Sequence, residues 1–102
     1  MKVLLIAFSM VLATAALAQE PAQRGHALLE DHCARCHAIE KTGNSPNPVA
    51  PAFRTLNRSF DLDLFQGQLQ RGLMAGHPDM PEFKFSEGDA RAVAAYLRAV
   101  QE

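Results

Sequence analysis

The chain has only two cysteines, and both lie in the stretch Cys33-Ala34-Arg35-Cys36-His37. Two thiols three positions apart can each add to one vinyl group of a single porphyrin. A histidine directly after them can place its imidazole under the iron. The spacing therefore predicts one haem c attached through Cys33 and Cys36, with His37 as the proximal iron ligand.

Three other interpretations use the same residues. A redox-active dithiol of the thioredoxin type needs a βαβ context, and no run of alternating apolar residues is long enough to indicate a sheet. Structural zinc usually takes a second ligand pair at short spacing, whereas His26, His32 and His77 are scattered singly. Cysteines packed simply as small apolar side chains are the third interpretation. Because the chain has no other cysteine, haem attachment is favoured over all three.

The haem iron has a sixth coordination position, for which Met80 is the predicted ligand. Met80 stands in a segment that also holds Pro78 and Pro81. The fixed φ angles of these prolines lower the entropy cost of holding a thioether against the iron. Met74 lies at a predicted helix end and is less restrained, while His77 and an open position remain alternatives.

The first 18 residues have the features of a secretory signal peptide. Lys2 begins a short positive region, residues 3–12 are nearly all apolar, and Ala16 and Ala18 are small residues where a signal peptidase reads them. The apolar stretch is shorter than the about 20 residues that a spanning helix needs. We therefore expect cleavage after residue 18 and a domain of residues 19–102 that is soluble in a bacterial periplasm, with no stable membrane insertion.

Composition narrows the function classes further. The 102 residues include ten Lys plus Arg and eleven Asp plus Glu, and loss of Lys2 with the leader would change the net charge from −1 to −2. Such a charge gives no strong attraction to nucleic acid. The chain has no Trp, and a domain of this size often needs a disulfide, a metal or a cofactor for stability. A bound haem would supply the missing part of the core.

A first helix and a long loop are expected to position the two cysteines and His37. The helix is predicted to begin at residue 21 or 22 and to end near Cys33. His26 and His32 fall within it, and both are expected on its surface. Residues 41–54 follow as a loop rich in Pro, Gly and Asn, and unstructured loops of that length are usually functional.

Two more helices are expected further along the chain. Apolar residues three and four apart predict a helix over residues 61–71, followed by a glycine as its stop signal. Ser86, with Asp89 three residues on, predicts the N-terminal cap of a last helix that continues to Val100. Residues 74–83, between these helices, cannot be helical throughout because two of them precede prolines.

Taken together, these residues resemble a class I cytochrome c over nearly all of the chain after the leader. The Cys-x-x-Cys-His motif and the pair formed by Met80 and the following proline carry the resemblance. It implies an all-α cytochrome c fold, with three to five helices wrapped around one covalently bound haem. Gly25 and Tyr96 match the family positions where the first and last helices cross closely. Pro51 matches the proline whose carbonyl accepts a hydrogen bond from the proximal imidazole, which implies that it orients His37.

The chain also departs from the family. It lacks a Trp near a haem propionate, and it lacks the ring of lysines around the haem edge. Arg54, Asn57 and Arg58 lie in the right region for propionate partners, with a solvated loop face as the alternative for each.

A haem with His37 and Met80 both bound to its iron has no free position for a substrate, which indicates an electron carrier and not an enzyme. The predicted function is a periplasmic monohaem c-type cytochrome. It is expected to be a monomer that carries electrons from a dehydrogenase or quinol-oxidising donor to a terminal acceptor. It could work free or as a subunit of a larger oxidoreductase. The alternative is a haem enzyme subunit or gas-binding haem protein with an open or labile sixth position.

Overall fold

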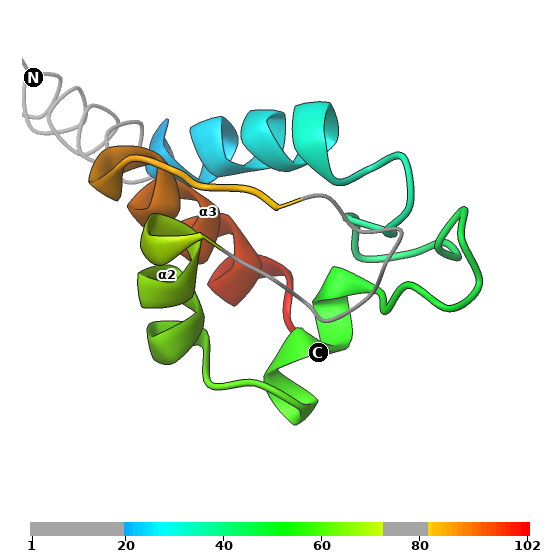
Figure 1. Ribbon diagram of the computed structural model, residues 1–102. Helices are drawn as coiled ribbons and strands as arrows, with labels where there is room; N and C mark the ends of the chain where they lie inside the picture. Colours follow the sequence, from blue (N-terminus) through cyan, green and yellow to red (C-terminus); the bar gives the residue numbers. More distant parts are fainter. Residues whose placement is uncertain (1–19, 73–81) are drawn as a thin grey trace, which may run out of the picture.

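The computed structural model describes residues 20–72 and 82–102, which form helices and connecting segments without a β-strand among them. Residues 20–32 are helical, as predicted for the first helix. They are followed by the 3-10 helix η1 (Phe53–Arg58), α2 (Leu62–Arg71) and α3 (Glu87–Val100) (Figure 1). This architecture agrees with the all-α fold expected from the sequence.

Two predictions concern residues outside these ranges. The signal peptide of residues 1–18 is one, and the segment that carries Met80 is the other. Within residues 20–72 and 82–102, no helix combines the length and apolar character needed to cross a membrane.

The helix α2 ends at the glycine predicted as its stop signal, and it begins one residue after the predicted start. The Asp61 side chain accepts a hydrogen bond from the Asp63 backbone N–H at 2.8 Å, which satisfies one of the unpaired donors of the first turn. At the other end Gly72 has a φ of 103°, a conformation that side chains disfavour. Between these ends Phe65 and Leu69 are buried and point into the protein interior.

Among the described residues, the helix α3 contributes more buried side chains than any other element. The Ser86 hydroxyl accepts from the Asp89 backbone N–H at 3.2 Å, as predicted for the cap. Six side chains of the helix are buried, at the helical spacing seen in the sequence: Ala90, Ala92, Val93, Ala94, Leu97 and Val100. This helix is therefore the central support on which the other elements pack.

The first helix crosses α3 where the resemblance places the crossing. Gly25 is buried, and a Cβ added to it would lie 2.6 Å from the Ala92 carbonyl carbon and 3.0 Å from the Tyr96 Cβ. Only glycine lets the two backbones approach this closely. One turn further along the first helix, Leu29 is buried in the core.

Tyr96 connects α3 to the chain that follows the cysteine motif. Its hydroxyl donates a hydrogen bond to the Ile39 carbonyl at 2.6 Å and lies 3.4 Å from a carboxylate oxygen of Glu40. His26 Nε2 lies 2.5 Å from the other carboxylate oxygen of Glu40, and its ring meets the Tyr96 ring edge-on. His26 is partly exposed, in line with the expected surface position, and it also links two elements distant in sequence.

We expect Tyr96→Phe to lower the free energy of unfolding by about 1 kcal/mol at pH 7, because the Ile39 carbonyl loses its donor. Burial first, and then the charge of Glu40 and a hydrogen bond to it, raises the pKa of Tyr96 to about 12. A raised folded-state pKa means that the neutral phenol stabilises the fold below pH 10 and that this contribution disappears as the pH rises toward 12. In urea titrations the difference between wild type and variant should therefore shrink above pH 10, and a difference independent of pH would contradict the assignment.

The 3-10 helix η1 was not predicted. Its first two residues fall within the stretch 41–54 that the sequence indicated as a loop. Phe53 and Leu56 are both buried, and a spacing of three places side chains on one side of a 3-10 helix. The burial of two side chains therefore decides the local conformation, whereas the neighbouring Pro and Gly residues had indicated a loop.

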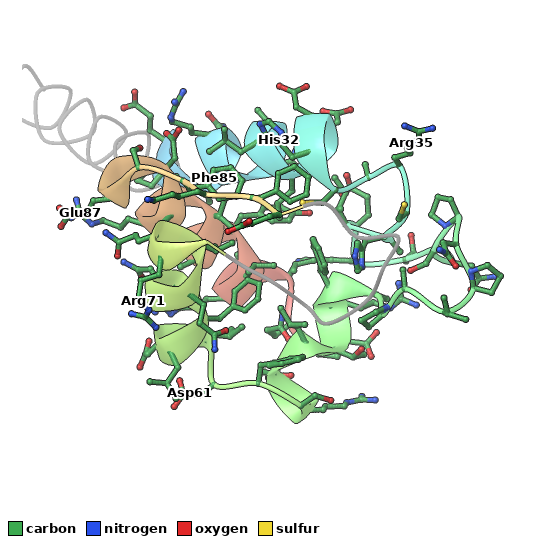
Figure 2. All side chains as sticks on the ribbon, viewed as in Figure 1. His32, Arg35, Asp61, Arg71, Phe85 and Glu87 are labelled. Atoms are coloured by element: carbon green, nitrogen blue, oxygen red, sulfur yellow. The ribbon has the colours of Figure 1, made fainter. Side chains whose placement is uncertain are left out.

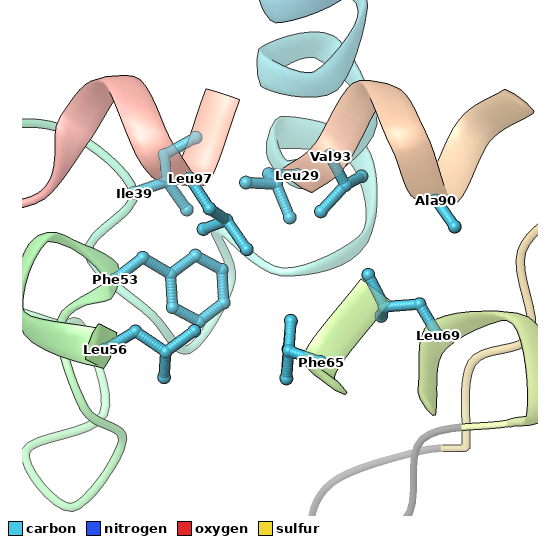
Figure 3. Close-up of a cluster of buried hydrophobic side chains, with 9 residues drawn as sticks. All are labelled: Leu29, Ile39, Phe53, Leu56, Phe65, Leu69, Ala90, Val93 and Leu97. Carbon is cyan, nitrogen blue, oxygen red and sulfur yellow. The ribbon is translucent and has the colours of Figure 1, made fainter. Parts of the chain in front are cut away.

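Apolar side chains from all these elements converge in one cluster (Figure 3). The cluster consists of Leu29, Ile39, Phe53, Leu56, Phe65, Leu69, Ala90, Val93 and Leu97. Among the described residues, no polar or charged side chain is buried with them. Cys33 and Ala34 of the cysteine motif pack against this apolar cluster.

Candidate haem site

The two cysteines lie on a helical turn that continues the first helix. The backbone N–H groups of Cys33 and Ala34 both donate to the Leu29 carbonyl, at 2.8 and 3.0 Å. The Cys33 carbonyl in turn accepts from the N–H groups of Cys36 and His37, at 3.2 and 2.9 Å. Residues three apart on such a turn lie on the same face, so both thiols can reach one flat partner.

Both thiols are free and half-buried. Burial first, with the charge of Cys36 adding to it, raises the pKa of Cys33 to about 11. The Cys33 thiol is therefore neutral at physiological pH. Nucleophilic thiols of dithiol oxidoreductases have lowered pKa values instead, so this environment is unlike theirs.

His37 is fixed through one ring nitrogen and one ring face. Its Nδ1 lies 2.7 Å from the Pro51 carbonyl oxygen, which is the contact that the resemblance implies. A carbonyl can only accept, so Nδ1 carries the proton and Nε2 is left with its lone pair. The ring also stacks on Phe53, with centroids 4.6 Å apart and planes 29° from parallel. An imidazole held in this way is prepared to coordinate a metal through Nε2.

The loop after His37 is held against the motif by backbone hydrogen bonds. The Asn47 N–H donates to the Cys36 carbonyl at 3.1 Å, and the Ala38 N–H donates to the Ser45 hydroxyl at 2.9 Å. The Phe53 N–H donates to the Ala38 carbonyl at 2.9 Å. These bonds bring Pro51 and Phe53 to the histidine although more than a dozen residues separate them in sequence.

Sequence reasoning missed the part that Phe53 plays. It follows Pro51 by two positions in the stretch that carries the resemblance, but only the proline was assigned a contact with His37. The pattern contained the signal, because an aromatic residue near a predicted ligand and a conformationally fixed proline is a candidate for ring stacking. The contact itself depends on η1, which was not predicted.

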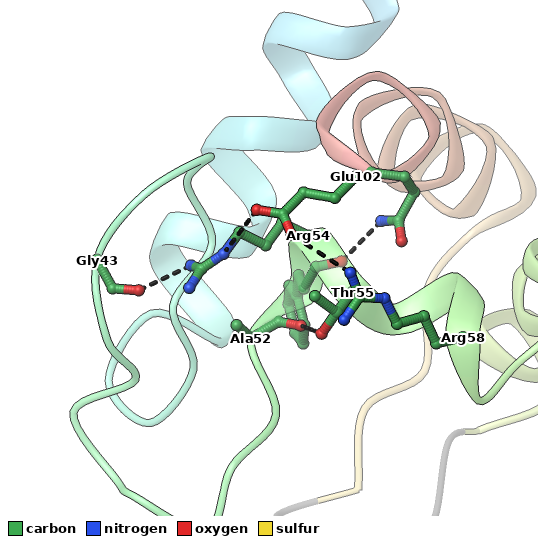
Figure 4. A network of polar contacts seen from close by, with 8 residues as sticks. Gly43, Ala52, Arg54, Thr55, Arg58 and Glu102 are labelled. Atoms are coloured by element: carbon green, nitrogen blue, oxygen red, sulfur yellow. Dashed lines mark hydrogen bonds and ion pairs between the residues drawn. The ribbon is translucent and has the colours of Figure 1, made fainter.

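The three residues considered for haem propionates have different surroundings. Arg54 donates to the Gly43 carbonyl at 2.7 Å and lies 3.4 Å from a carboxylate oxygen of Glu102 (Figure 4). Arg58 lies 3.5 Å from the other oxygen of that carboxylate. Asn57 is exposed, and its backbone N–H donates to the Gln101 side-chain oxygen. Arg54 therefore fastens the loop at Gly43, and Arg58 is on the surface.

The residue Met80 lies outside the described residues, but the chain that follows it is anchored at two points. The Phe85 N–H donates to the Leu69 carbonyl of α2 at 2.8 Å. The rings of Phe83 and Phe85 meet the His32 ring edge-on, with centroids 5.5 and 5.6 Å away. Figure 2 shows His32 and Phe85 together, while Arg35 projects away from the motif. The exposed His32 thus joins the cysteine-bearing helix to this chain, a contact that its sequence position did not indicate.

The described residues fit a covalently bound haem. Two free thiols share one face of a turn, and an imidazole next to them has its Nε2 available for iron. The apolar cluster provides the environment that a porphyrin face requires. Within residues 20–72 and 82–102, no group of three or more His, Cys, Asp and Glu side chains could hold a metal ion by themselves.

Comparison with protein families identifies the class. Residues 20–97, well over half of the chain, match the family model described as cytochrome C oxidase, cbb3-type, subunit III. The chain therefore belongs to this family of c-type cytochromes. Comparisons with curated proteins and with solved structures returned no match.

Membership establishes the cofactor and the general role. The protein carries covalently bound haem c, and Cys33 and Cys36 are the two cysteines predicted to attach it. It takes part in electron transfer between redox partners.

We expect Cys36→Ser to remove one thioether and to reduce the yield of holoprotein several-fold, because a single thiol must then hold the porphyrin during folding. Haem peroxidase staining after denaturing electrophoresis, normalised to total chain, measures the yield. Arg35→Ala is the matched control, since this exposed side chain lies between the cysteines and projects outward. Equal yields for the two variants would contradict attachment at Cys36.

Proposed function

We propose that the protein is a soluble monohaem cytochrome c that carries single electrons in the periplasm, with His37 and Met80 as its axial ligands. Residues 1–18 act as a cleaved signal peptide, and residues 19–102 form the working domain, a monomer. The donor is a dehydrogenase or a quinol-oxidising enzyme, and a terminal acceptor receives the electron. The observation that carries the proposal is the hydrogen bond from His37 to Pro51, which leaves Nε2 of this histidine available next to the two cysteines.

Haem c, when bound, supplies a one-electron Fe(III)/Fe(II) couple. The chain's own residues set the conditions for that couple. Pro51 fixes the tautomer and orientation of the His37 ring, and Phe53 restricts its rotation. A thioether ligand from Met80 favours the reduced state, and the apolar cluster excludes water and acts in the same direction.

The absorption spectrum of the purified, export-matured holoprotein in both oxidation states tests the proposal. We expect a low-spin spectrum in each state, a sulfur-to-iron charge-transfer band when oxidised, and no change on addition of carbon monoxide to the reduced protein. A missing charge-transfer band together with ready binding of carbon monoxide would instead support the alternative, a haem enzyme or gas-binding protein with an open sixth position. N-terminal sequencing of the same sample tests cleavage after residue 18.

A second candidate is a haem subunit of a larger oxidase, and the description of the matched family favours it. In that case the protein works inside a membrane-bound complex and does not diffuse between partners. Fractionation of cells that produce the tagged full chain separates the two. A free carrier is expected in the periplasmic fraction as a monomer by size exclusion, whereas an oxidase subunit should stay with the membranes and co-purify with other haem-containing subunits.

A further inference from the structure

Gln101, directly after α3, joins this helix to both ends of η1. Its side-chain Nε2 donates to the Phe53 carbonyl at 2.6 Å and to the Leu97 carbonyl at 2.8 Å. Its Oε1 accepts from the Asn57 backbone N–H at 2.9 Å. Both amide hydrogens and the amide oxygen are therefore engaged, and all three partners are backbone groups.

One of these partners would otherwise lack a hydrogen bond within its own helix. The Leu97 carbonyl belongs to the last turn of α3, whose carbonyl groups have no intrahelical donor. The Phe53 N–H donates to the Ala38 carbonyl, and the Phe53 carbonyl accepts a hydrogen bond from Gln101 Nε2. The peptide groups on both sides of the Phe53 side chain are thus held by two separate parts of the chain.

His37 is held by the Phe53 ring and by the Pro51 carbonyl. The ring stacks on the imidazole, and the Pro51 carbonyl receives its Nδ1 hydrogen. If only the Phe53 N–H were held, residues 51–53 could shift, and both contacts with His37 would loosen together. Gln101 supplies the second fixed end.

We propose that Gln101 is a positioning residue for the proximal histidine, acting through Phe53 and Pro51 on the strength of the Nδ1–H···O bond of His37. The inference rests on the proposed role of His37 as iron ligand. A strong bond from Nδ1–H to a carbonyl makes Nε2 more basic, which favours the ferric state. Loss of the Gln101 contacts therefore weakens this bond and raises the midpoint potential.

The test compares Gln101→Leu with wild type as holoproteins. The leucine is similar in size but makes none of the three hydrogen bonds. We expect a higher midpoint potential and a several-fold faster solvent exchange of the His37 Nδ1 proton, measured by NMR. Gln101→Glu keeps the acceptor for Asn57 and loses both donors, so it should shift both quantities in the same direction. If Gln101→Leu yields no holoprotein, Gln101→Glu decides the outcome.

Ser86→Ala is the matched control, because it weakens α3 at its other end and touches neither η1 nor His37. It should leave the potential and the proton exchange unchanged while lowering the unfolding midpoint in urea. Unchanged potential and exchange in the Gln101 variants, or equal shifts in Ser86→Ala, would overturn the inference. A wild-type spectrum without histidine ligation would instead refute the proposed function, so the two failures are distinguishable.

Discussion

Gly25→Ala is expected to lower the free energy of unfolding of the holoprotein by about 3 kcal/mol, the upper part of the range for overpacked sites. The added Cβ would lie 2.6 Å from the Ala92 carbonyl carbon, and closer still to the carbonyl oxygen. These are backbone atoms in the middle of α3, so no side-chain rotation can relieve the contact. For a domain of this size the loss corresponds to a fall of about 12–24 °C in the thermal midpoint.

The chain offers a control of the same chemical type. Gly88 lies in the first turn of α3, and an added Cβ would meet nothing within 4 Å. Alanine there should raise the stability by up to about 1 kcal/mol, because it restricts the unfolded chain and favours the helix. Urea unfolding followed by haem absorbance measures both variants. Similar effects of the two substitutions would mean that the helices do not cross at Gly25 as closely as described.

Met80→Ala is expected to have the largest effect on function. It should lower the midpoint potential on the order of 0.1–0.2 V, a sizeable part of the ~0.8 V that axial ligands span, because the thioether that favours the reduced state is lost. The oxidised protein should lose its sulfur-to-iron charge-transfer band, and the reduced protein should bind carbon monoxide. Potentiometric titration followed in the visible spectrum measures the potential. The spectrum with carbon monoxide measures the access of this ligand to the iron.

Met74→Ala is the control for this experiment, since it removes another thioether from the same connection between α2 and α3. It should leave the potential and the charge-transfer band unchanged. A Met80 variant with wild-type potential would show that Met80 is not the ligand and would direct attention to Met74 and then to His77. A variant closed to carbon monoxide would indicate that another side chain had taken the sixth position.

The sequence alone was sufficient for the three α-helices, because their signals are local. Asp61 and Ser86 cap α2 and α3 with their own side chains, and Gly72 ends α2 with a positive φ. Apolar residues recur at helical spacing on the faces that are buried, so pattern and structure agree. The prediction of haem attachment was equally local, since it depends on two thiols within one turn.

Contacts between distant residues could not be read from such patterns. The 3-10 helix η1 forms within a stretch of loop composition because Phe53 and Leu56 are buried there. His26 meets Glu40 and Tyr96, and nothing in its own neighbourhood indicated these partners. Where the resemblance supplied a long-range expectation, as at Gly25 and Pro51, the corresponding contacts are present.

What the sequence by itself determined is thus the three α-helices, their approximate ends, and the chemistry available at the cysteine motif. These follow from hydrogen bonds and periodicities within a few residues of chain. Only the tertiary structure decided how His37 is held, because Pro51 and Phe53 contact it from a distant part of the chain and Gln101 holds Phe53 from the end of α3. Such contacts depend on the packing of α3 against η1, and packing brings together residues that no local pattern relates.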